Sequence, residues 1–169
     1  MRFEKVTLEE AIADFEDLNK RKLTDEERKA LKGILEELEL PTRATNGSAG
    51  YDFHCPFEYR IPPYARRVRI PLFIKVVDMP TNVGLFILNR SGLALKKGLR
   101  LDNAVGLIDS DYKDGIWYQG SHYPTADEGL IIGQGDRICQ GVFLPLLFVD
   151  NEDNGKKKER KGGFGSTGK

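Results

Sequence analysis

The sequence predicts an all-β fold, a jelly-roll-like antiparallel barrel or sandwich, preceded by a helical hairpin. Two capped amphipathic segments lie within the first forty residues. From Pro41 onward the chain consists of short runs rich in Val, Ile, Leu and Phe, separated by Gly, Pro, Asn and Asp. No long helical pattern recurs after residue 45. We therefore expect a helical extension (1–39), a β-rich domain (40–150) and a Gly-rich C-terminal segment (151–169).

The helical hairpin is predicted from two start signals. Thr7 with Glu10, and Thr24 with Glu27, have the spacing of a capping box, which satisfies free amide donors at a helix start. Apolar residues then recur on one helical face, at 8, 11, 12, 15 and 18 and again at 30, 31, 34, 35 and 38. The simplest interpretation is a packing element on the main domain; a protein partner for the hairpin is the alternative.

The predicted strands are five apolar runs: "RRVRIPLFIKVV", "VGLFILN", "AVGLI", "GLIIG" and "RICQGVFLPLLFV". Pro62-Pro63, Pro80, "KKG" and "GQGD" supply turns between them. After Val149 the chain has almost no apolar residue except Phe164, which is typical of a flexible tail.

Composition excludes several classes of function. Lys plus Arg equals Asp plus Glu, 26 each, so no overall positive field favours nucleic acid. The two cysteines, Cys55 and Cys139, lack the spacing of a metal site or a disulfide framework. No apolar run is long enough to span a membrane, and the N-terminus lacks the apolar core of a signal peptide. We expect a soluble cytoplasmic protein that binds a small ligand.

Five stretches carry candidate chemistry: "SAGYDF" (48–53), "NRSGLA" (89–94), "DNAVGLIDSDYKDG" (102–115), "GDRICQ" (135–140) and "RKGGFGSTGK" (160–169). Each alone has an ordinary explanation as a turn, a loop or a tail. Together and in this order, over roughly residues 40–169, they resemble the five motifs of the trimeric dUTP pyrophosphatase (dUTPase) family. The resemblance implies a homotrimer with shared active sites that hydrolyses dUTP to dUMP and pyrophosphate with Mg²⁺, limiting uracil incorporation into DNA.

The "GLIDSDY" stretch offers two carboxylates for activating a water molecule. Asp109 follows an apolar run and is expected to be oriented by a half-buried strand, whereas Asp111 is expected nearer solvent. By resemblance, Asp109 activates the attacking water, and Tyr112 lies against the deoxyribose and excludes a 2′-hydroxyl. The ordinary alternatives are a turn carboxylate that caps backbone amides and a strand aromatic that packs across a sheet.

Other residues are assigned to the base, the phosphates and the metal. An amide at Asn103 can present a donor and an acceptor to a pyrimidine edge, with the backbone from Gly106 to Ile108 completing the contacts. A narrow hairpin would also exclude the thymine methyl. The expected phosphate ligands are Arg90, Ser91, Gly92 and Gln140. The resemblance implies that Asp52 positions Mg²⁺ indirectly, through water, because this ion binds mainly to substrate phosphates.

The C-terminal segment is interpreted as a lid that orders over bound substrate. Phe164 is expected to stack on the base, while Arg160, Gly165, Ser166 and Thr167 close on the outer phosphates. Two departures from the family pattern are visible. Lys113-Asp114-Gly115 replaces the usual Arg-Gly-Glu, and only Lys161 separates Arg160 from "GGF", so Lys158 or Lys161 is an alternative to Arg160.

Two other functions fit the same fold. A dCTP deaminase requires a glutamate for proton shuttling, and only Glu128, in an expected turn, follows the hairpin motif. A regulatory binding module that uses nucleotide as a switch is the second, since an added helical hairpin is a place for partner contacts. The intact Asp109 and the complete Gly-rich tail favour hydrolysis.

Overall fold

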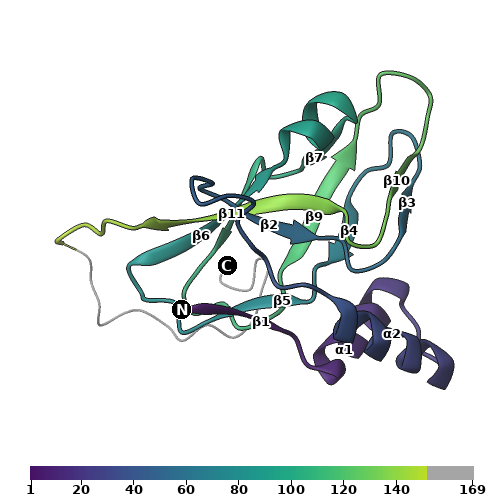
Figure 1. Cartoon of the computed structure of the whole chain (residues 1–169), viewed down its shortest axis with the longest axis horizontal. Coiled ribbons are helices and arrows are strands. Elements are labelled where there is room, and N and C mark those ends of the chain that lie inside the picture. Colours follow the sequence, from purple (N-terminus) through teal and green to yellow (C-terminus); the bar gives the residue numbers. More distant parts are fainter. Residues whose placement is uncertain (152–169) are drawn as a thin grey trace.

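The computed structural model of the chain describes residues 1–151, and its architecture confirms the predicted all-β class. Antiparallel strands form the body, and two helices lie together on one side of it (Figure 1). The elements are β1 (Arg2–Lys5), α1 (Leu8–Asn19), α2 (Asp25–Glu37), β2 (Tyr51–His54), β3 (Tyr59–Ile61), β4 (Val68–Pro71), β5 (Ile74–Val77), β6 (Val83–Asn89), the π-helix η1 (Gly92–Lys96), β7 (Leu99–Leu101), β8 (Val105–Ile108), β9 (Trp117–His122), β10 (Leu130–Ile132) and β11 (Arg137–Pro145).

Both helices begin where the sequence predicts. The amide of Glu10 donates to the Thr7 hydroxyl at 3.2 Å, and the Thr7 amide donates to the Glu10 carboxylate at 2.6 Å. Thr24 and Glu27 make the same reciprocal pair at 3.2 and 2.9 Å. These caps satisfy amide donors that the first helical turn leaves free. Of the residues predicted to form the apolar faces of the two helices, all are at least half-buried except Ala30, which is exposed.

A strand that the sequence analysis does not predict precedes α1. Residues Arg2–Lys5 form β1 and pair antiparallel with β5. The Phe3 ring packs edge-on against Phe53, with ring centroids 5.4 Å apart. From α1, Phe15 lies 5.2 Å from Phe57 and 5.8 Å from Phe73 between ring centroids. The N-terminal segment therefore contributes a strand and a helix to the packing of the main domain.

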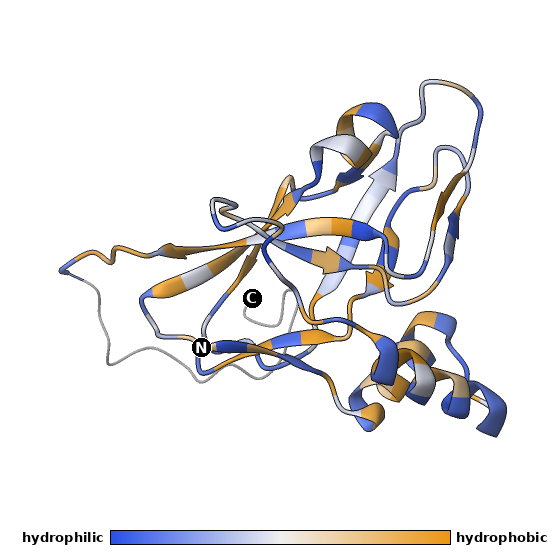
Figure 2. Ribbon diagram, in the orientation of Figure 1, coloured by the Kyte–Doolittle hydropathy of each residue, from blue (hydrophilic) through white to orange (hydrophobic). Residues whose placement is uncertain are grey.

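The largest sheet places the candidate motifs side by side. Its strand order is β2-β11-β6-β8, and a second sheet has the order β4-β9-β7. All the pairings in the described part of the chain are antiparallel. Apolar side chains from both sheets belong to one buried hydrophobic cluster. Figure 2 shows hydrophobic segments in the strands of the body and also in the arm that follows β11, where Leu147 and Phe148 are exposed. The fully buried side chains include Phe53, Phe73, Leu85, Tyr118 and Ile138.

Local backbone geometry divides the longest predicted run. "RRVRIPLFIKVV" forms two strands, β4 and β5, because Phe73 adopts a left-handed φ of 54° between them. The Phe73 side chain is fully buried, so core packing holds this unfavourable conformation. Gly98, with φ 72°, precedes β7; a Cβ there would lie 2.0 Å from the Tyr123 carbonyl oxygen, so only glycine fits.

Among residues 1–151, no helix has the length and apolarity required to cross a bilayer.

Candidate active site

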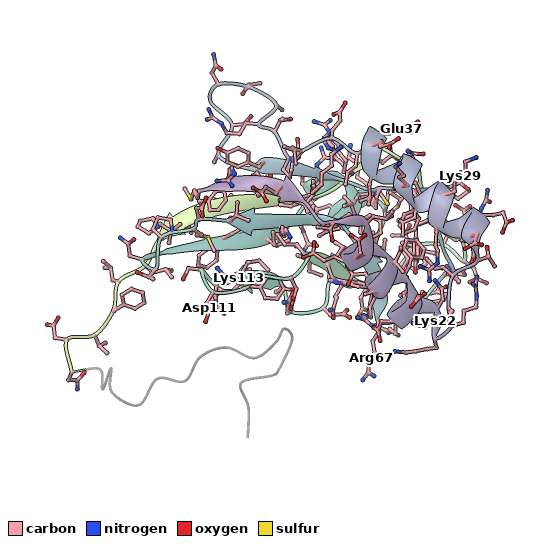
Figure 3. All side chains as sticks on the ribbon, turned by 90° about the horizontal axis from the view of Figure 1, so that it is seen from below. Lys22, Lys29, Glu37, Arg67, Asp111 and Lys113 are labelled. Atoms are coloured by element: carbon pink, nitrogen blue, oxygen red, sulfur yellow. The ribbon has the colours of Figure 1, made fainter. Side chains whose placement is uncertain are left out.

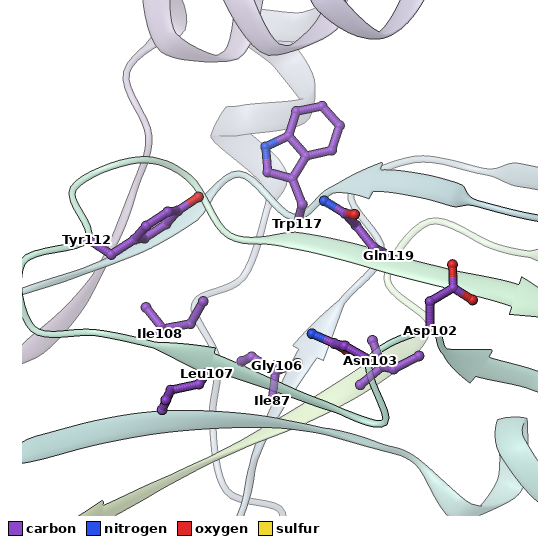
Figure 4. A pocket seen from close by; sticks show the side chains of 10 residues that line it. Ile87, Asp102, Asn103, Gly106, Leu107, Ile108, Tyr112, Trp117 and Gln119 are labelled. Carbon is purple, nitrogen blue, oxygen red and sulfur yellow. The ribbon is translucent and has the colours of Figure 1, made fainter. Parts of the chain in front are cut away.

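A pocket of about 280 Å³ opens between the β8 hairpin and β9. It contains four of the predicted substrate-binding residues: Asn103, Gly106, Ile108 and Tyr112. Figure 4 shows the Asn103 amide and the Tyr112 ring lying at opposite ends of this space. The remaining lining residues are Ile87, Leu101, Asp102, Leu107, Trp117 and Gln119.

The β8 hairpin is shaped by a tight turn and by a close approach of two strands. Ala104 has a left-handed φ of 60°, and its amide donates to the Leu101 carbonyl at 3.3 Å. Gly106 pairs with Ile87 of β6, and a Cβ at position 106 would lie only 3.2 Å from the Ile87 Cβ. A residue larger than glycine would push the hairpin away from β6. Glycine therefore keeps the strand close and leaves its backbone accessible from the pocket.

The predicted acid and its neighbouring aromatic lie in the turn that follows β8. Asp109 is half-buried directly after the buried Ile108. Its carbonyl accepts the Tyr112 amide at 3.1 Å. Tyr112 is only 6% exposed, and its hydroxyl donates to the Gly115 carbonyl at 2.9 Å. Asp111 is exposed and points away from the body, as expected (Figure 3). The Tyr112 ring is thus held as a fixed wall next to Asp109.

A second group of predicted residues gathers around Asp52 on β2. Its carboxylate oxygens lie 3.2 Å from Arg90 Nε and 3.2 Å from Arg137 Nη1. Arg90 Nη1 also donates to the Arg137 carbonyl at 3.0 Å. Gln140 pairs with Asp52 across β2 and β11, and its amide donates to the Asn89 carbonyl at 3.2 Å. Asp52 therefore orients two guanidinium groups. One of them belongs to Arg137, which the sequence analysis did not include in the site.

Ser91 and Gly92 follow Arg90 at the start of η1, where both are exposed. A Cβ at Gly92 would meet no atom within 4 Å, so the backbone there is open to a ligand. None of Arg90, Ser91, Gly92 and Gln140 lines the hairpin pocket. The described chain brings the predicted site residues together in two groups, one around the hairpin pocket on β8 and a cationic group at the end of β6.

The pairing register separates these two groups. Ile108 lies opposite Leu85 on β6, and Arg90 follows five residues after Leu85. Asp109 lies one position further, at the level of Gly84, so at the rise of a β-strand Arg90 and Asp109 are roughly 20 Å apart along the strand direction. One chain therefore presents its predicted water-activating acid and its predicted phosphate-binding arginine at opposite ends of β6 and β8.

Comparisons with known proteins show which family shares this sequence and fold. The dUTPase family model matches residues 36–168. The chain belongs to the dUTPase family. Curated relatives named deoxyuridine 5′-triphosphate nucleotidohydrolase include those of Lactococcus lactis, 38% identical over 78% of this chain and 89% of the relative, and of Haemophilus ducreyi, 41% identical over 79% and 89%.

Solved structures show the same fold. The crystal structure of the dUTPase from Streptococcus mutans has a TM-score of 0.64 at 30% identity, covering 89% of this chain and all of that chain. A mutant dUTPase of the Staphylococcus aureus phage phi11 has a TM-score of 0.61 at 19% identity, covering 74% of this chain and 94% of that one. That work describes a structural Mg(II) ion in the phage protein. The predicted family and fold are therefore confirmed.

The family's fifth motif lies outside the described residues. The expected lid contacts of Arg160, Phe164, Gly165, Ser166 and Thr167 consequently remain predictions. The described chain adds two contributions that the motifs do not indicate, the pairing of Arg137 with Asp52 and the wall that β9 gives to the pocket. One signal in the sequence could have revealed the β9 wall. Side chains two positions apart share one face of a strand, so Trp117 and Gln119 face the same way and Tyr118 faces the other.

Proposed function

We propose that the protein hydrolyses dUTP to dUMP and pyrophosphate, with Asp109 as the base that activates water. The observation that carries this proposal is the hairpin pocket, which Asn103, Ile108 and Tyr112 line together; Asp109 directly follows Ile108 in the chain. The water oxygen bonds to the α-phosphorus as its proton passes to Asp109. The bond from that phosphorus to the oxygen bridging to the β-phosphate then breaks, and pyrophosphate leaves.

The hairpin supplies selectivity for the base. The Asn103 amide points into the pocket, and the backbone between Gly106 and Ile108 lies along the same wall (Figure 4). These groups match the alternating acceptors and donor of a uracil edge, whereas cytosine presents an amine where uracil has a carbonyl. The closeness of β8 to β6 at Gly106 restricts the space available for a thymine methyl group.

Tyr112 supplies selectivity for the sugar. Its ring is buried, and its hydroxyl is held by the Gly115 carbonyl, so the ring cannot swing aside without losing a buried hydrogen bond. A ribonucleotide would need room for a 2′-hydroxyl against this wall. The fixed ring therefore favours deoxyribonucleotides.

The site is completed by more than one chain, in a homotrimer. The separation of roughly 20 Å between Asp109 and Arg90 along the strands supports this, because both groups must act on one triphosphate. Apolar side chains on β8 and β11 also face outward: Leu107 is 51% exposed and Leu144 is 44% exposed. In the assembled site, Arg90, Ser91, Gly92 and Gln140 of one subunit bind phosphates of the nucleotide held by a neighbour's hairpin.

Mg²⁺ fits this site as an ion that arrives with the substrate. No group of three or more His, Cys, Asp or Glu within residues 1–151 is placed to hold a metal. Asp52 is already paired with Arg90 and Arg137, which leaves it a role through water rather than by direct coordination. Bound to the triphosphate, Mg²⁺ would neutralise phosphate charge and help align the reacting atoms. Arg160 and Phe164 to Thr167 would then close over the nucleotide.

A cytoplasmic location, where the deoxynucleotide pool is used, belongs to the same proposal. The two cysteines support it, because Cys55 and Cys139 are both buried, free thiols. Burial raises the pKa of Cys55 to about 11 and raises that of Cys139 further, so both remain protonated. Such thiols suit a reducing compartment.

Two experiments test this function. Incubation of the purified protein with each dNTP and Mg²⁺ should give dUMP and pyrophosphate from dUTP alone; dUTP formed from dCTP would identify a deaminase instead. Shared sites are tested by mixing Asp109→Asn and Arg90→Ala proteins after unfolding and joint refolding. Each variant alone should be nearly inactive, but mixed trimers contain some sites with both native residues and should recover activity. No recovery, with mixed trimers shown by mass, would place both residues in one chain's site.

A further inference from the structure

Trp117 forms part of the pocket wall opposite the base-binding hairpin. Along β9, Tyr118 points into the core and is 1% exposed, whereas Trp117 and Gln119 face the other way and line the pocket. The indole stands between Tyr112 and Gln119 in Figure 4. A flat, half-buried aromatic group therefore lies beside the space in which the nucleoside is expected.

The indole is held from the neighbouring strand by Arg69. In the β4–β9 register Arg69 lies opposite Gln119, which places Trp117 on the diagonal of the same sheet face. Diagonal neighbours are within reach when one side chain is long and the other aromatic. The guanidinium carbon of Arg69 lies 4.6 Å from the Trp117 ring centroid, a distance typical of a cation–π contact. This contact restricts rotation of the indole.

Arg69 is in turn fixed by the N-terminal helix. Its Nη1 donates to Asp17 Oδ2 at 3.3 Å, from β4 to α1. The side chains of Arg69 and Asp17 are 36% and 51% exposed, so solvent screens this pair and it acts as a restraint rather than a strong bond. Asp17 also binds Lys20 at 2.7 Å, which holds the carboxylate on the same helix.

The same N-terminal segment also backs the other aromatic wall of the pocket. A Cβ at Gly115 would lie 3.0 Å from Val6 Cγ1 and 3.3 Å from Asp14 Oδ2, so the loop is packed tightly against this segment. The Gly115 carbonyl is the acceptor for the Tyr112 hydroxyl. The N-terminal segment, which precedes the family's matched region beginning at residue 36, thus reaches Trp117 through Arg69 and Tyr112 through Gly115.

We propose that Trp117 is a substrate-contacting residue that packs against the deoxyuridine part of the nucleotide, and that Arg69 and Asp17 are positioning residues that set the angle of its indole. The proposal rests on the proposed dUTP hydrolysis. It assigns the N-terminal helix a role in nucleotide affinity, because the chain of contacts from Asp17 through Arg69 ends at the pocket wall.

The chain offers a direct readout, because Trp117 is its single tryptophan. Titration of the wild-type protein with dUMP should change the indole fluorescence and yield a dissociation constant. Arg69→Gln should weaken dUMP binding and raise KM for dUTP about three- to tenfold, the range expected for loss of a cation–π restraint, with kcat within about twofold. Asp17→Asn should shift KM in the same direction by less. Trp117→Ala has no indole to report binding, so it is measured by turnover alone; among these variants it should raise KM most.

Arg66→Gln is a matched control. Its guanidinium carbon lies 4.2 Å from the Tyr123 ring centroid, the same kind of contact, but neither residue lines the pocket. This variant should leave both fluorescence and KM unchanged. Thermal unfolding and the oligomeric mass verify the fold of every variant. If Trp117→Ala does not fold, the KM values of Arg69→Gln and Asp17→Asn test the proposal, because both side chains are partly exposed.

Two results would overturn the proposal, and they are distinguishable. If the wild-type protein hydrolyses dUTP but dUMP leaves the indole emission unchanged and Arg69→Gln keeps the wild-type KM, the role of Trp117 is wrong while the enzymatic function stands. If the wild-type protein neither binds dUMP nor hydrolyses dUTP, the proposed function fails and this inference fails with it.

Discussion

Replacing Asp14 with asparagine should stabilise the folded protein at neutral and alkaline pH. Asp14 lies on α1, where it packs against Gly115. Burial raises the pKa of its carboxyl from an ordinary 3.8 to about 6, with further contributions from the negative charges of Asp114, Glu10 and Asp17, while Arg69 acts in the opposite direction. An ionised Asp14 is therefore a cost to folding.

The size of this cost follows from the shift in pKa. A pKa of about 6 in the folded state corresponds to about 3 kcal/mol of lost stability once the carboxyl is ionised in both states. Because Asp14 is only partly buried, solvent screening reduces the expected gain from Asp14→Asn to about 1 kcal/mol. For a domain of this size, that gain raises the unfolding temperature by about 2–4 °C.

The gain should depend on pH in a defined direction. Between pH 3.8 and about 6 the folded state holds the Asp14 proton more tightly than the unfolded state, so this group makes the protein less stable as pH rises. The advantage of asparagine should be complete above about pH 6 and should shrink as pH falls towards 3.8.

Thermal or urea unfolding at pH 7.5 and pH 5, at one protein concentration, measures this difference. Asp17→Asn is the matched control on the same helix, because hydrogen bonds from Lys20 and Arg69 lower the pKa of that carboxyl. Its substitution should destabilise the protein at pH 7.5. An Asp14→Asn protein that is no more stable at pH 7.5, or whose gain is equal at pH 5, would refute the reasoning.

Four further predictions concern the site. Asp109→Asn should lower kcat about 10²–10⁴-fold while dUMP binding survives, and near-normal pyrophosphate release would remove Asp109 as the base. Tyr112→Ala should narrow the preference for dUTP over UTP in kcat/KM; an unchanged ratio would leave Tyr112 a packing residue. Gly106→Ala should raise KM for dUTP about tenfold, because its Cβ would press on Ile87 at 3.2 Å; the wild-type KM would contradict the tight-hairpin argument. Deleting the residues after Lys158 should cut turnover severely without changing the oligomeric mass measured by light scattering, and full turnover would disprove the lid.

Local signals in the chain determined much of the secondary structure. The Thr7 and Thr24 caps lie within four residues of the glutamates that complete them, so their pattern is legible in the sequence and both helices form there. The apolar run 83–89 forms β6 with the predicted bounds. By contrast, β1 is short and partly polar, and within residues 1–151 it pairs only with β5, some seventy residues later. A strand of this kind has no local signature.

The sequence by itself also indicated the family, because the motifs place particular side chains in a particular order, and it predicted which of those side chains form the site. Their spatial grouping was decided by the tertiary structure. Strand register, which depends on pairing between distant segments, separates Asp109 from Arg90 and brings Arg137 to Asp52. The same kind of long-range pairing sets Arg69 diagonally beside Trp117, so that α1 reaches the pocket wall. Contacts between residues fifty positions apart depend on the fold as a whole, and no local pattern encodes them.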